Sequence, residues 1–253
     1  MSGNAAVRVG IGGWVFPPWR GEFYPRGLVQ AQELSHASRQ VTAIEINGTF
    51  YGSQKPASFR RWHDETPDDF VFSVKGPRFV THRRVLATAG PSLDRFFASG
   101  VLELRAKLGP ILWQFAPFLR FDEVAFSAFL ALLPRDIDGR ALRHVVEVRH
   151  ASFAASASIE LLRSQHIAVA LVDDEKYPLV EAITADFVYA RLRRCSADEP
   201  AGYAPQALDA WAARCRDWRA DGRDVFIYFI NGAKIRAPAA AQALIERLSR
   251  RAD

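Results

Sequence analysis

Cysteine is scarce in this chain of 253 residues: only Cys195 and Cys215 occur, and no C-x-x-C pair is present. A disulfide scaffold or a structural zinc site is therefore not expected. No stretch approaches the ~18 apolar residues of a membrane span, and residues 1–6 lack the apolar core of a signal peptide. We predict a cytoplasmic protein that does not contact a membrane.

Several motifs of cofactor and nucleophile chemistry are missing as well. The glycines at 10, 12 and 13 form no dinucleotide fingerprint, because Val15 stands where a third glycine belongs. No P-loop, Gly-x-Ser-x-Gly elbow or His-Glu-x-x-His motif is present. We therefore predict no cofactor. The alternative is a divalent metal with Glu147 and Asp173 as distant ligands.

Lysine is rare too: it supplies 5 of the 33 cationic residues, so arginine supplies 28. Against 28 acidic residues the formal charge is +5, and a hydrophobic fraction of 49% is ordinary for a globular protein. The acidic residues are interspersed, which favours a mixed solvated surface. The basic balance nevertheless permits contact with nucleic acid.

Short β-branched apolar runs alternate with helical patterns along the whole chain, which is typical of a parallel sheet built from βα units. The predicted strands are Val7–Gly12, Thr42–Ile46, Phe70–Lys75, Ile111–Phe115, Val145–Arg149, Ala168–Val172, Phe187–Leu192 and Val225–Phe229. The predicted helices are 28–39, 56–65, 92–107, 122–132, 157–165, 205–220 and 239–250.

This alternation predicts an α/β fold, a single (β/α)8 TIM-type barrel with eight parallel strands that spans residues 1–253. The helix after the sixth strand is predicted to be shortened or missing, because residues 175–185 are few and interrupted by proline. Residues 1–6 are predicted to be a flexible N-terminus, and residues 251–253 a C-terminal tail.

The predicted strands become polar toward their carboxyl ends, and the polar residues of each strand share one parity. They are Glu45 and Asn47, Ser73 and Lys75, Glu147 and Arg149, and Arg191 and Arg193. The opposite parity is apolar and is predicted to lie under the helices, so the polar parity faces the barrel interior. Barrel enzymes carry their sites at the carboxyl ends of the strands. We expect a polar pocket there.

Three carboxylates are the predicted catalytic residues: Glu45, Glu147 and Asp173. Two carboxylates that flank a substrate act as acid and base, or as nucleophile and acid. The alternative is an internal salt bridge with Arg149, Arg191 or Lys75. For Asp173, the alternative is a turn at the entry to a loop.

Arginine side chains bind phosphate and carboxylate through paired hydrogen bonds, and aromatic rings stack on sugars or bases. The predicted substrate-binding residues are Trp14, Asn47, Tyr51, Lys75, His82, Gln114, Arg149, His150, Arg191, Arg193 and Asn231. The cations could instead balance the neighbouring acids. The aromatic residues of the first loop, which follows the first predicted strand, could instead pack against the barrel rim. They are Trp14, Phe16, Trp19, Phe23 and Tyr24.

Several longer motifs resemble the YecE-like proteins, which form domain of unknown function 72. They include Gly10-Ile-Gly-Gly-Trp14, Glu45-Ile-Asn-Gly-Thr-Phe-Tyr51, Leu108-Gly-Pro-Ile-Leu-Trp-Gln-Phe115, Val146-Glu-Val-Arg-His150 and Tyr228-Phe-Ile-Asn231. The resemblance covers nearly the whole chain and implies a TIM-type barrel, with no activity attached. Two segments depart from the pattern of such proteins: Arg193-Arg194 stands where they usually carry His-Gly, and the segment from Gly232 to Pro238 replaces the short loop and Asn-Ala helix start expected after Asn231.

These observations predict an enzyme of the hydrolase or lyase type that acts on an anionic or sugar-containing small molecule. A second hypothesis is a nucleic-acid-binding protein or nuclease, since Arg193-Arg194, Lys234 and Arg236 lie near predicted strand ends. A third is a scaffold that binds a ligand without catalysis. If the carboxylates are catalytic, Glu147→Gln and Arg191→Ala should abolish function and leave thermal stability nearly intact. No oligomeric state is predicted.

Overall fold

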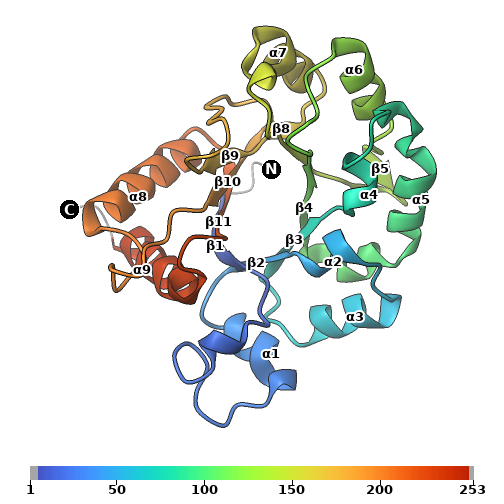
Figure 1. Cartoon of the computed structure of the whole chain (residues 1–253). Helices are drawn as coiled ribbons and strands as arrows, with labels where there is room; N and C mark the ends of the chain where they lie inside the picture. The colour runs from blue at the N-terminus through green and yellow to red at the C-terminus, as the bar shows by residue number, and fades with distance from the viewer. Residues whose placement is uncertain (1–4, 251–253) are drawn as a thin grey trace.

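A closed ring of parallel strands forms the centre of the molecule, and helices surround it (Figure 1). The computed structural model describes residues 5–250. Most of the predicted flexible N-terminus and all of the predicted tail at 251–253 lie outside the described residues. The strands are β1 (Val7–Gly12), β2 (Ala43–Ile46), β3 (Val71–Lys75), β4 (Leu108–Gln114), β7 (His144–Glu147), β8 (Ala168–Val169), β9 (Leu171–Asp173), β10 (Phe187–Leu192) and β11 (Asp224–Phe229).

The strand order confirms the predicted TIM-type barrel. Each strand pairs in parallel with the next around the ring, except β8 with β9, and β11 pairs with β1. The predicted sixth strand is split in two: β8 pairs with β7, whereas β9 pairs with β10. Ala170, between the two pieces, still donates its N–H to the carbonyl of Val146 at 2.9 Å. The split segment therefore closes the ring.

The main helices lie near their predicted positions around the strands. They are α1 (Glu33–Ala37), α3 (Pro56–Asp64), α5 (Gly90–Ala98), α6 (Glu123–Ala131), α7 (Ser156–Ser164), α8 (Pro205–Ala220) and α9 (Ala237–Ser249). The predicted helix at 28–39 is reduced to the five residues of α1, which follow a 3-10 turn at Gln30–Gln32. The predicted helix at 92–107 is wrong in its second half. Gly100, with φ at 95°, ends α5, and a 3-10 segment, Val101–Lys107, follows.

The connection between β9 and β10 has no helix, as predicted. Its buried Thr184 hydroxyl accepts from the N–H of Val169 (2.9 Å) and donates to the carbonyl of Ile167 (2.7 Å). The loop thereby satisfies backbone groups beside β8 that would otherwise be buried without partners. A short antiparallel hairpin, β5 (Asp136–Ile137) and β6 (Arg140–Ala141), was not predicted.

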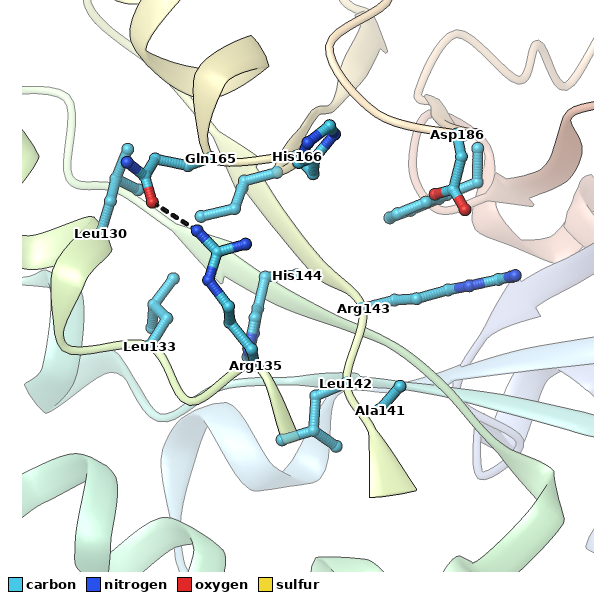
Figure 2. A pocket seen from close by; sticks show the side chains of 12 residues that line it. Leu130, Leu133, Arg135, Ala141, Leu142, Arg143, His144, Gln165, His166 and Asp186 are labelled. Carbon is cyan, nitrogen blue, oxygen red and sulfur yellow. Dashed lines mark hydrogen bonds between the residues drawn. The ribbon is translucent and has the colours of Figure 1, made fainter. Parts of the chain in front are cut away.

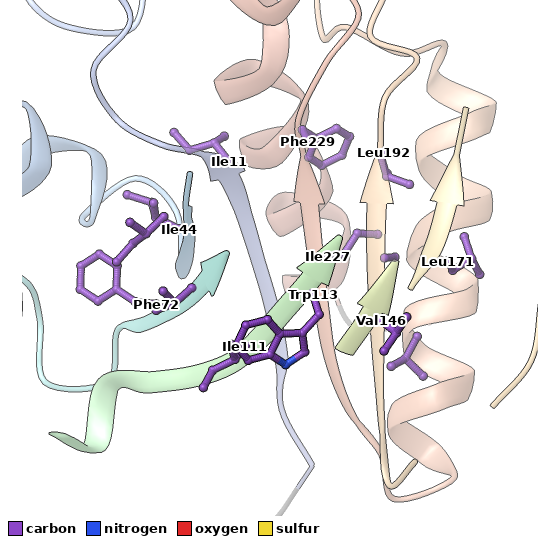
Figure 3. Close-up of a cluster of buried hydrophobic side chains, with 14 of the residues drawn as sticks. Ile11, Ile44, Phe72, Ile111, Trp113, Val146, Leu171, Leu192, Ile227 and Phe229 are labelled. Atoms are coloured by element: carbon purple, nitrogen blue, oxygen red, sulfur yellow. The ribbon is translucent and has the colours of Figure 1, made fainter. Parts of the chain in front are cut away.

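Alternating side chains along the strands form two separate apolar layers. One layer packs under the helices, and Figure 3 shows members of it such as Ile44, Phe72, Trp113 and Phe229. The other fills the barrel interior and includes Leu112, Val145, Phe187, Tyr189 and Tyr228. Because the interior layer ends in polar residues toward the carboxyl ends, the fold places these polar residues at one mouth.

Two short helices follow strands at that mouth. They are α2 (Gly48–Tyr51) after β2 and α4 (Arg78–Thr81) after β3. The Thr49 hydroxyl donates to the Lys75 carbonyl at 2.7 Å, and the Thr81 hydroxyl donates to the Gln114 carbonyl at 2.6 Å. These two bonds attach both loops to the tops of the neighbouring strands. Within the described residues, no helix is long and apolar enough to span a bilayer.

Candidate functional site

Arg191 lies across the barrel interior between the two predicted catalytic glutamates. Its Nε and Nη2 donate to Oε2 and Oε1 of Glu45, each at 2.9 Å, and its Nη1 donates to Oε2 of Glu147. Glu45 is on β2, Glu147 on β7 and Arg191 on β10, so these bonds join strands that are not neighbours in the sheet. Such contacts require all three side chains to point inward.

The remaining oxygen, Oε1 of Glu147, is also occupied, and Oε2 of Glu45 accepts a second bond. The Tyr189 hydroxyl donates to Oε2 of Glu45 at 2.8 Å. Gln114 Nε2 and Arg149 Nε each donate to Oε1 of Glu147 at 2.8 Å. Glu45 and Glu147 have no exposed surface, and Arg191 is 1% exposed. We call Glu45, Glu147 and Arg191 the inner charge layer, in which every charge is paired.

The pairing controls protonation in the inner charge layer. Burial alone would raise the pKa of Glu147, but the charges of Arg191, Arg149 and Lys75 outweigh it and hold that pKa at about 2. Burial likewise disfavours the Arg191 cation, and the two carboxylates overcome it and raise the pKa of Arg191 above its ordinary value. The Glu147 carboxylate and the guanidinium therefore both stay ionised across the physiological range.

Further cations lie around the inner charge layer, and their bonding is incomplete. Arg193 has Nη1 4.0 Å from Oε1 of Glu147 and Nε 3.1 Å from Oδ2 of Asp174. Both of these arginine nitrogens are covered from solvent and make no hydrogen bond. With its amide oxygen turned toward Arg193, Asn231 accepts from Nη2 at 3.0 Å. Arg193 thus keeps unused donors.

Tyr177 forms a wall of the mouth beside two of the arginines. The Arg149 guanidinium lies 4.4 Å from the centroid of the Tyr177 ring, and that of Arg193 lies 5.4 Å from it. The Tyr177 hydroxyl accepts from Arg149 Nη1 at 3.4 Å. Sequence reasoning missed this residue, because it lies in the helix-less connection, where no periodicity predicts the direction of a side chain.

Lys75, at the end of β3, is 6% exposed and has no carboxylate within 4.0 Å among the described residues. Its Nζ lies 3.9 Å from the centroid of the Phe50 ring, on α2. Burial and the nearby Arg191 cation lower the pKa of Lys75 to about 7, against the opposing pull of Glu45 and Glu147. Near neutral pH, a substantial fraction of this lysine is therefore the uncharged amine.

The two predicted histidines have different environments. His82 follows α4, its ring centroid lies 5.3 Å from that of Phe50, and its covered Nε2 has no partner. Burial, with the charges of Arg149 and Lys75, lowers the pKa of His82. The Nδ1 of His150 instead accepts from the N–H of Ser152 at 3.2 Å and holds the start of a 3-10 turn.

We call Lys75, His82, Arg149 and Arg193 the outer charge layer.

Asp173, at the end of β9, lies apart from the two glutamates. Its carboxylate contacts Arg194 (3.7 Å) and the Tyr203 hydroxyl (3.4 Å). Burial raises the pKa of Asp173, and the charge of Arg194 opposes the shift. The three predicted catalytic carboxylates therefore do not form one cluster. Among residues 5–250, no three His, Cys, Asp or Glu side chains gather closely enough to hold a metal ion.

A cavity of about 260 Å³ opens between the first loop and α2, and no residue of either charge layer lines it. Its lining includes Trp14, Asn47, Gln54, Trp62 and Lys234. Two of these residues, Trp14 and Asn47, are in the predicted binding set. Tyr51, which is also in that set, is 74% exposed on α2 and does not line the cavity.

Other aromatic residues of the first loop serve packing. Trp19 and Tyr24 are buried, and their side chains donate to the carbonyls of Lys234 (3.0 Å) and Trp14 (2.6 Å). These bonds fix the walls of the cavity. Sequence reasoning missed Gln54 and Trp62 as lining residues, since neither belongs to a strand end.

A larger pocket, of about 350 Å³, lies at the opposite end of the barrel (Figure 2). Arg135, Arg143, His144, His166 and Asp186 line it, near the amino-terminal ends of β7, β8 and β10. Burial lowers the pKa of His144 to about 4, and its two ring nitrogens bond Trp113 (3.1 Å) and the Pro134 carbonyl (2.7 Å). This histidine is therefore neutral and structural, as is usual at this end of such barrels.

Comparison with solved structures supports the fold. A DUF72 family protein from Thermotoga maritima MSB8 has a TM-score of 0.76 at 22% identity, covering 96% of this chain and 98% of that one. One from Enterococcus faecalis V583 has a TM-score of 0.71 at 15% identity, covering 97% and 99%. At these identities the likeness shows the barrel architecture alone.

Two curated proteins are similar in sequence over part of their length. The UPF0759 protein YecE of Escherichia coli K12 is 28% identical over 155 residues, which are 61% of this chain and 52% of YecE. The UPF0759 protein YunF of Bacillus subtilis 168 is 27% identical over 117 residues, 44% of this chain and 40% of YunF. The chain thus spans about half the length of the curated relatives it matches or less. Since the family described as "Protein of unknown function DUF72" matches residues 8–253, nearly the whole chain, this protein belongs to the DUF72 family.

Proposed function

We propose that the mouth of the barrel binds a small anionic molecule and that the protein is an enzyme of the hydrolase or lyase type that acts on it. One observation carries this proposal: Arg193 has two covered guanidinium nitrogens without hydrogen-bond partners. Buried donors without partners cost about 1–3 kcal/mol each, so they are rarely kept without a purpose. An oxyanion would satisfy both.

The balance of charge at the mouth supports the same ligand. Lys75, Arg149, Arg191 and Arg193 are four cations, whereas Glu45, Glu147 and Asp174 are the three carboxylates closest to them. One positive charge is in excess when Lys75 is protonated. A phosphate or carboxylate group would neutralise it, and the planar guanidinium groups match the geometry of both.

The proposal assigns the chemistry to the outer charge layer. Glu147 remains ionised down to a pH of about 2, so it is a poor proton donor at neutral pH. We assign Glu45 and Glu147 to hold Arg191 in place, and proton transfer to Lys75 and His82, whose lowered pKa values leave neutral nitrogens available. The catalytic roles predicted for Glu45, Glu147 and Asp173 stay predictions.

The cavity between the first loop and α2 would receive the uncharged part of the ligand. The indole rings of Trp14 and Trp62, whose centroids are 5.1 Å apart, offer an apolar surface, while Asn47 and Gln54 offer amides. Such a mixture of one flat apolar wall and a few polar groups suits a sugar ring or a similar small skeleton. The sugar-containing substrate stays a prediction. The absence of a cofactor also stays a prediction.

Calorimetric titration with inorganic phosphate tests the proposal. We expect saturable binding to the wild-type protein and at least tenfold weaker binding to Arg193→Met, because a hydrogen bond to a charged group contributes about 1.5–3 kcal/mol. Arg219→Met, which removes an exposed arginine on α8, is the matched control and should bind phosphate normally. Equal binding by both variants, or no binding by the wild type, would refute the anion site.

Nucleic acid is the alternative ligand, and the extra arginines support it less. Arg194 lies 3.7 Å from Asp173 and 3.5 Å from Glu175, so its charge is compensated locally. Binding to the phosphate backbone falls steeply with salt. Duplex binding that weakens in this way, without competition from phosphate at the mouth, would favour the alternative.

A further inference from the structure

We infer that Lys75 is a nucleophile that forms an imine with the carbonyl group of its ligand, which would be a carboxylated or phosphorylated aldehyde or ketone. The inference rests on the proposed anion site, because the anionic group of the ligand is what holds the carbonyl beside the amine. It adds a covalent step and a substrate class to the general hydrolase or lyase function proposed above.

A comparison of two buried lysines supports this role. Lys107 is 3% exposed, and its Nζ donates to the carbonyl of Thr66 at 2.8 Å, to that of His63 and to the Thr66 hydroxyl. Lys75 is nearly as buried, at 6%, yet its Nζ makes no hydrogen bond among the described residues and lies against the ring of Phe50. Lys107 has the bonding of a structural lysine, and Lys75 does not.

The surroundings of Lys75 favour the uncharged amine, which is the nucleophilic form. Arg191 on β10, Arg149 after β7, and His82 after α4 are the positively charged or titratable neighbours, and Glu45 and Glu147 are the acidic ones. Both carboxylates are already bound to Arg191, so neither is free to pair with the lysine. Lysines in apolar sites or beside other cations are the ones that act as nucleophiles in Schiff-base chemistry.

The proposed reaction balances with water as the only product besides the imine. The lone pair of Nζ attacks the carbonyl carbon, and one proton of the nitrogen passes to the carbonyl oxygen to give a neutral carbinolamine. A second proton, drawn from solvent, joins the hydroxyl, which leaves as water while the nitrogen supplies the electron pair for the new C=N bond of the protonated imine. The unpaired Nε2 of His82 lies in the same outer charge layer and is placed to pass protons to and from the departing oxygen.

Arg149 and Arg193 would hold the anionic end of such a ligand. The Nε of Arg149 donates to Glu147, and its Nη1 makes only a long hydrogen bond, 3.4 Å, to the Tyr177 hydroxyl. Arg193 adds two nitrogens that make no hydrogen bond, although its Nε lies 3.1 Å from the Asp174 carboxylate. A neutral carbonyl compound would lack these contacts and would not be held near Lys75.

Borohydride trapping tests the inference directly, and the low lysine content makes the result easy to locate. The wild-type protein would be incubated with pyruvate, glyoxylate or glyceraldehyde 3-phosphate, reduced with sodium borohydride, and digested for mass spectrometry. We expect one adduct, on Lys75, with at least one of the three probes. Lys75→Met should lose the adduct, and the control Lys55→Met, which removes an exposed lysine, should keep it.

Two further measurements keep the test decisive if Lys75→Met folds poorly. Inorganic phosphate should protect Lys75 of the wild type from labelling, and the labelling rate should reach half its maximum near pH 7 instead of near the ordinary lysine pKa of about 10.4. Labelling of Lys75 by neutral acetone as readily as by the anionic probes would overturn the proposed substrate class.

The outcomes separate this inference from the proposed function. Phosphate binding that depends on Arg193, without any adduct on Lys75, would overturn the imine and leave the anion site standing. Absence of both phosphate binding and adduct would overturn both. An adduct on Lys75 that phosphate suppresses would support both.

Discussion

The inner and outer charge layers lie next to each other at one mouth of the barrel, yet they differ in how completely their charges are paired. Arg191 bonds both Glu45 and Glu147, and the free lone pairs of these carboxylates accept from Tyr189, Gln114 and Arg149. In the outer layer, Lys75, His82 and Arg193 keep nitrogens without a hydrogen bond.

On the basis of this difference we assign the inner charges to the fold and the outer charges to the proposed ligand. A buried ion that is fully bonded has no donor or acceptor left for a ligand, which would have to break existing bonds to reach it. A buried donor without a partner gains from any acceptor that arrives. Residue type alone does not make this distinction, because both layers contain arginine.

The largest expected effect comes from breaking the inner charge layer. Arg191→Met leaves Glu45 and Glu147 buried without a cation, and removal of one partner from a buried ion pair costs about 3–5 kcal/mol. We expect the free energy of unfolding, measured by urea denaturation, to fall by that amount. The sequence alone predicts that stability stays nearly intact after Arg191→Ala or Glu147→Gln, whereas the bonding of Arg191 predicts a large loss.

Arg193→Met provides the contrast to that variant. Its side chain belongs to the outer layer and is held chiefly by one ion pair, with Asp174 at 3.1 Å, so its removal should lower stability less than Arg191→Met does while phosphate binding is lost. Equal losses of stability in the two variants would show that the two layers are one structural network.

The placement of the interior charges was predictable from the sequence. Side chains alternate strictly along a strand, so one parity of β2, β3, β7 and β10 had to face the interior once the barrel closed. Glu45, Lys75, Glu147 and Arg191 all lie where that alternation puts them.

The hairpin at β5 and β6 was also predictable. Its turn, Asp138-Gly139, has positive φ at both residues, and Asp-Gly is a typical sequence for such a turn.

The pairing within the site was not predictable. Whether Arg191 reaches Glu45, Glu147 or neither depends on the stagger of strands that are not neighbours, and the sequence of one strand does not contain that information. Loop residues were equally hidden: Tyr177 contacts the mouth, whereas His150 turns back to bond Ser152. Loops have no period from which a side-chain direction follows.

A further prediction concerns the pH dependence of stability caused by Lys75. Its pKa is lowered in the folded protein, so between about pH 7 and pH 10.5 the unfolded chain binds more protons at this residue, and stability rises with pH. We therefore expect the free energy of unfolding of the wild type, relative to Lys75→Met, to increase by at most roughly 5 kcal/mol across that range, since a change of one in pKa corresponds to about 1.4 kcal/mol. Urea denaturation of both proteins at several pH values measures the difference.

Added phosphate provides a further test of the pH dependence. An anion bound near Lys75 favours its charged form, so saturating phosphate should shrink the pH-dependent difference between wild type and Lys75→Met. A difference that is constant with pH would mean that Lys75 is paired in solution, and the contrast between the two layers would then fail at that residue.

The smallest expected effect is at the opposite end of the barrel. Arg143 bonds Asp224 at 2.6 Å and lies 5.4 Å from the centroid of Phe187, but its side chain is 40% exposed. Solvent-exposed ion pairs contribute about 0–1 kcal/mol, so Arg143→Met should lower the free energy of unfolding by no more than about that amount. It should leave phosphate affinity unchanged, since Arg143 lies near the amino-terminal ends of the strands, opposite the mouth. A marked loss of phosphate binding in Arg143→Met would place the anion in the pocket of Figure 2 and not at the mouth.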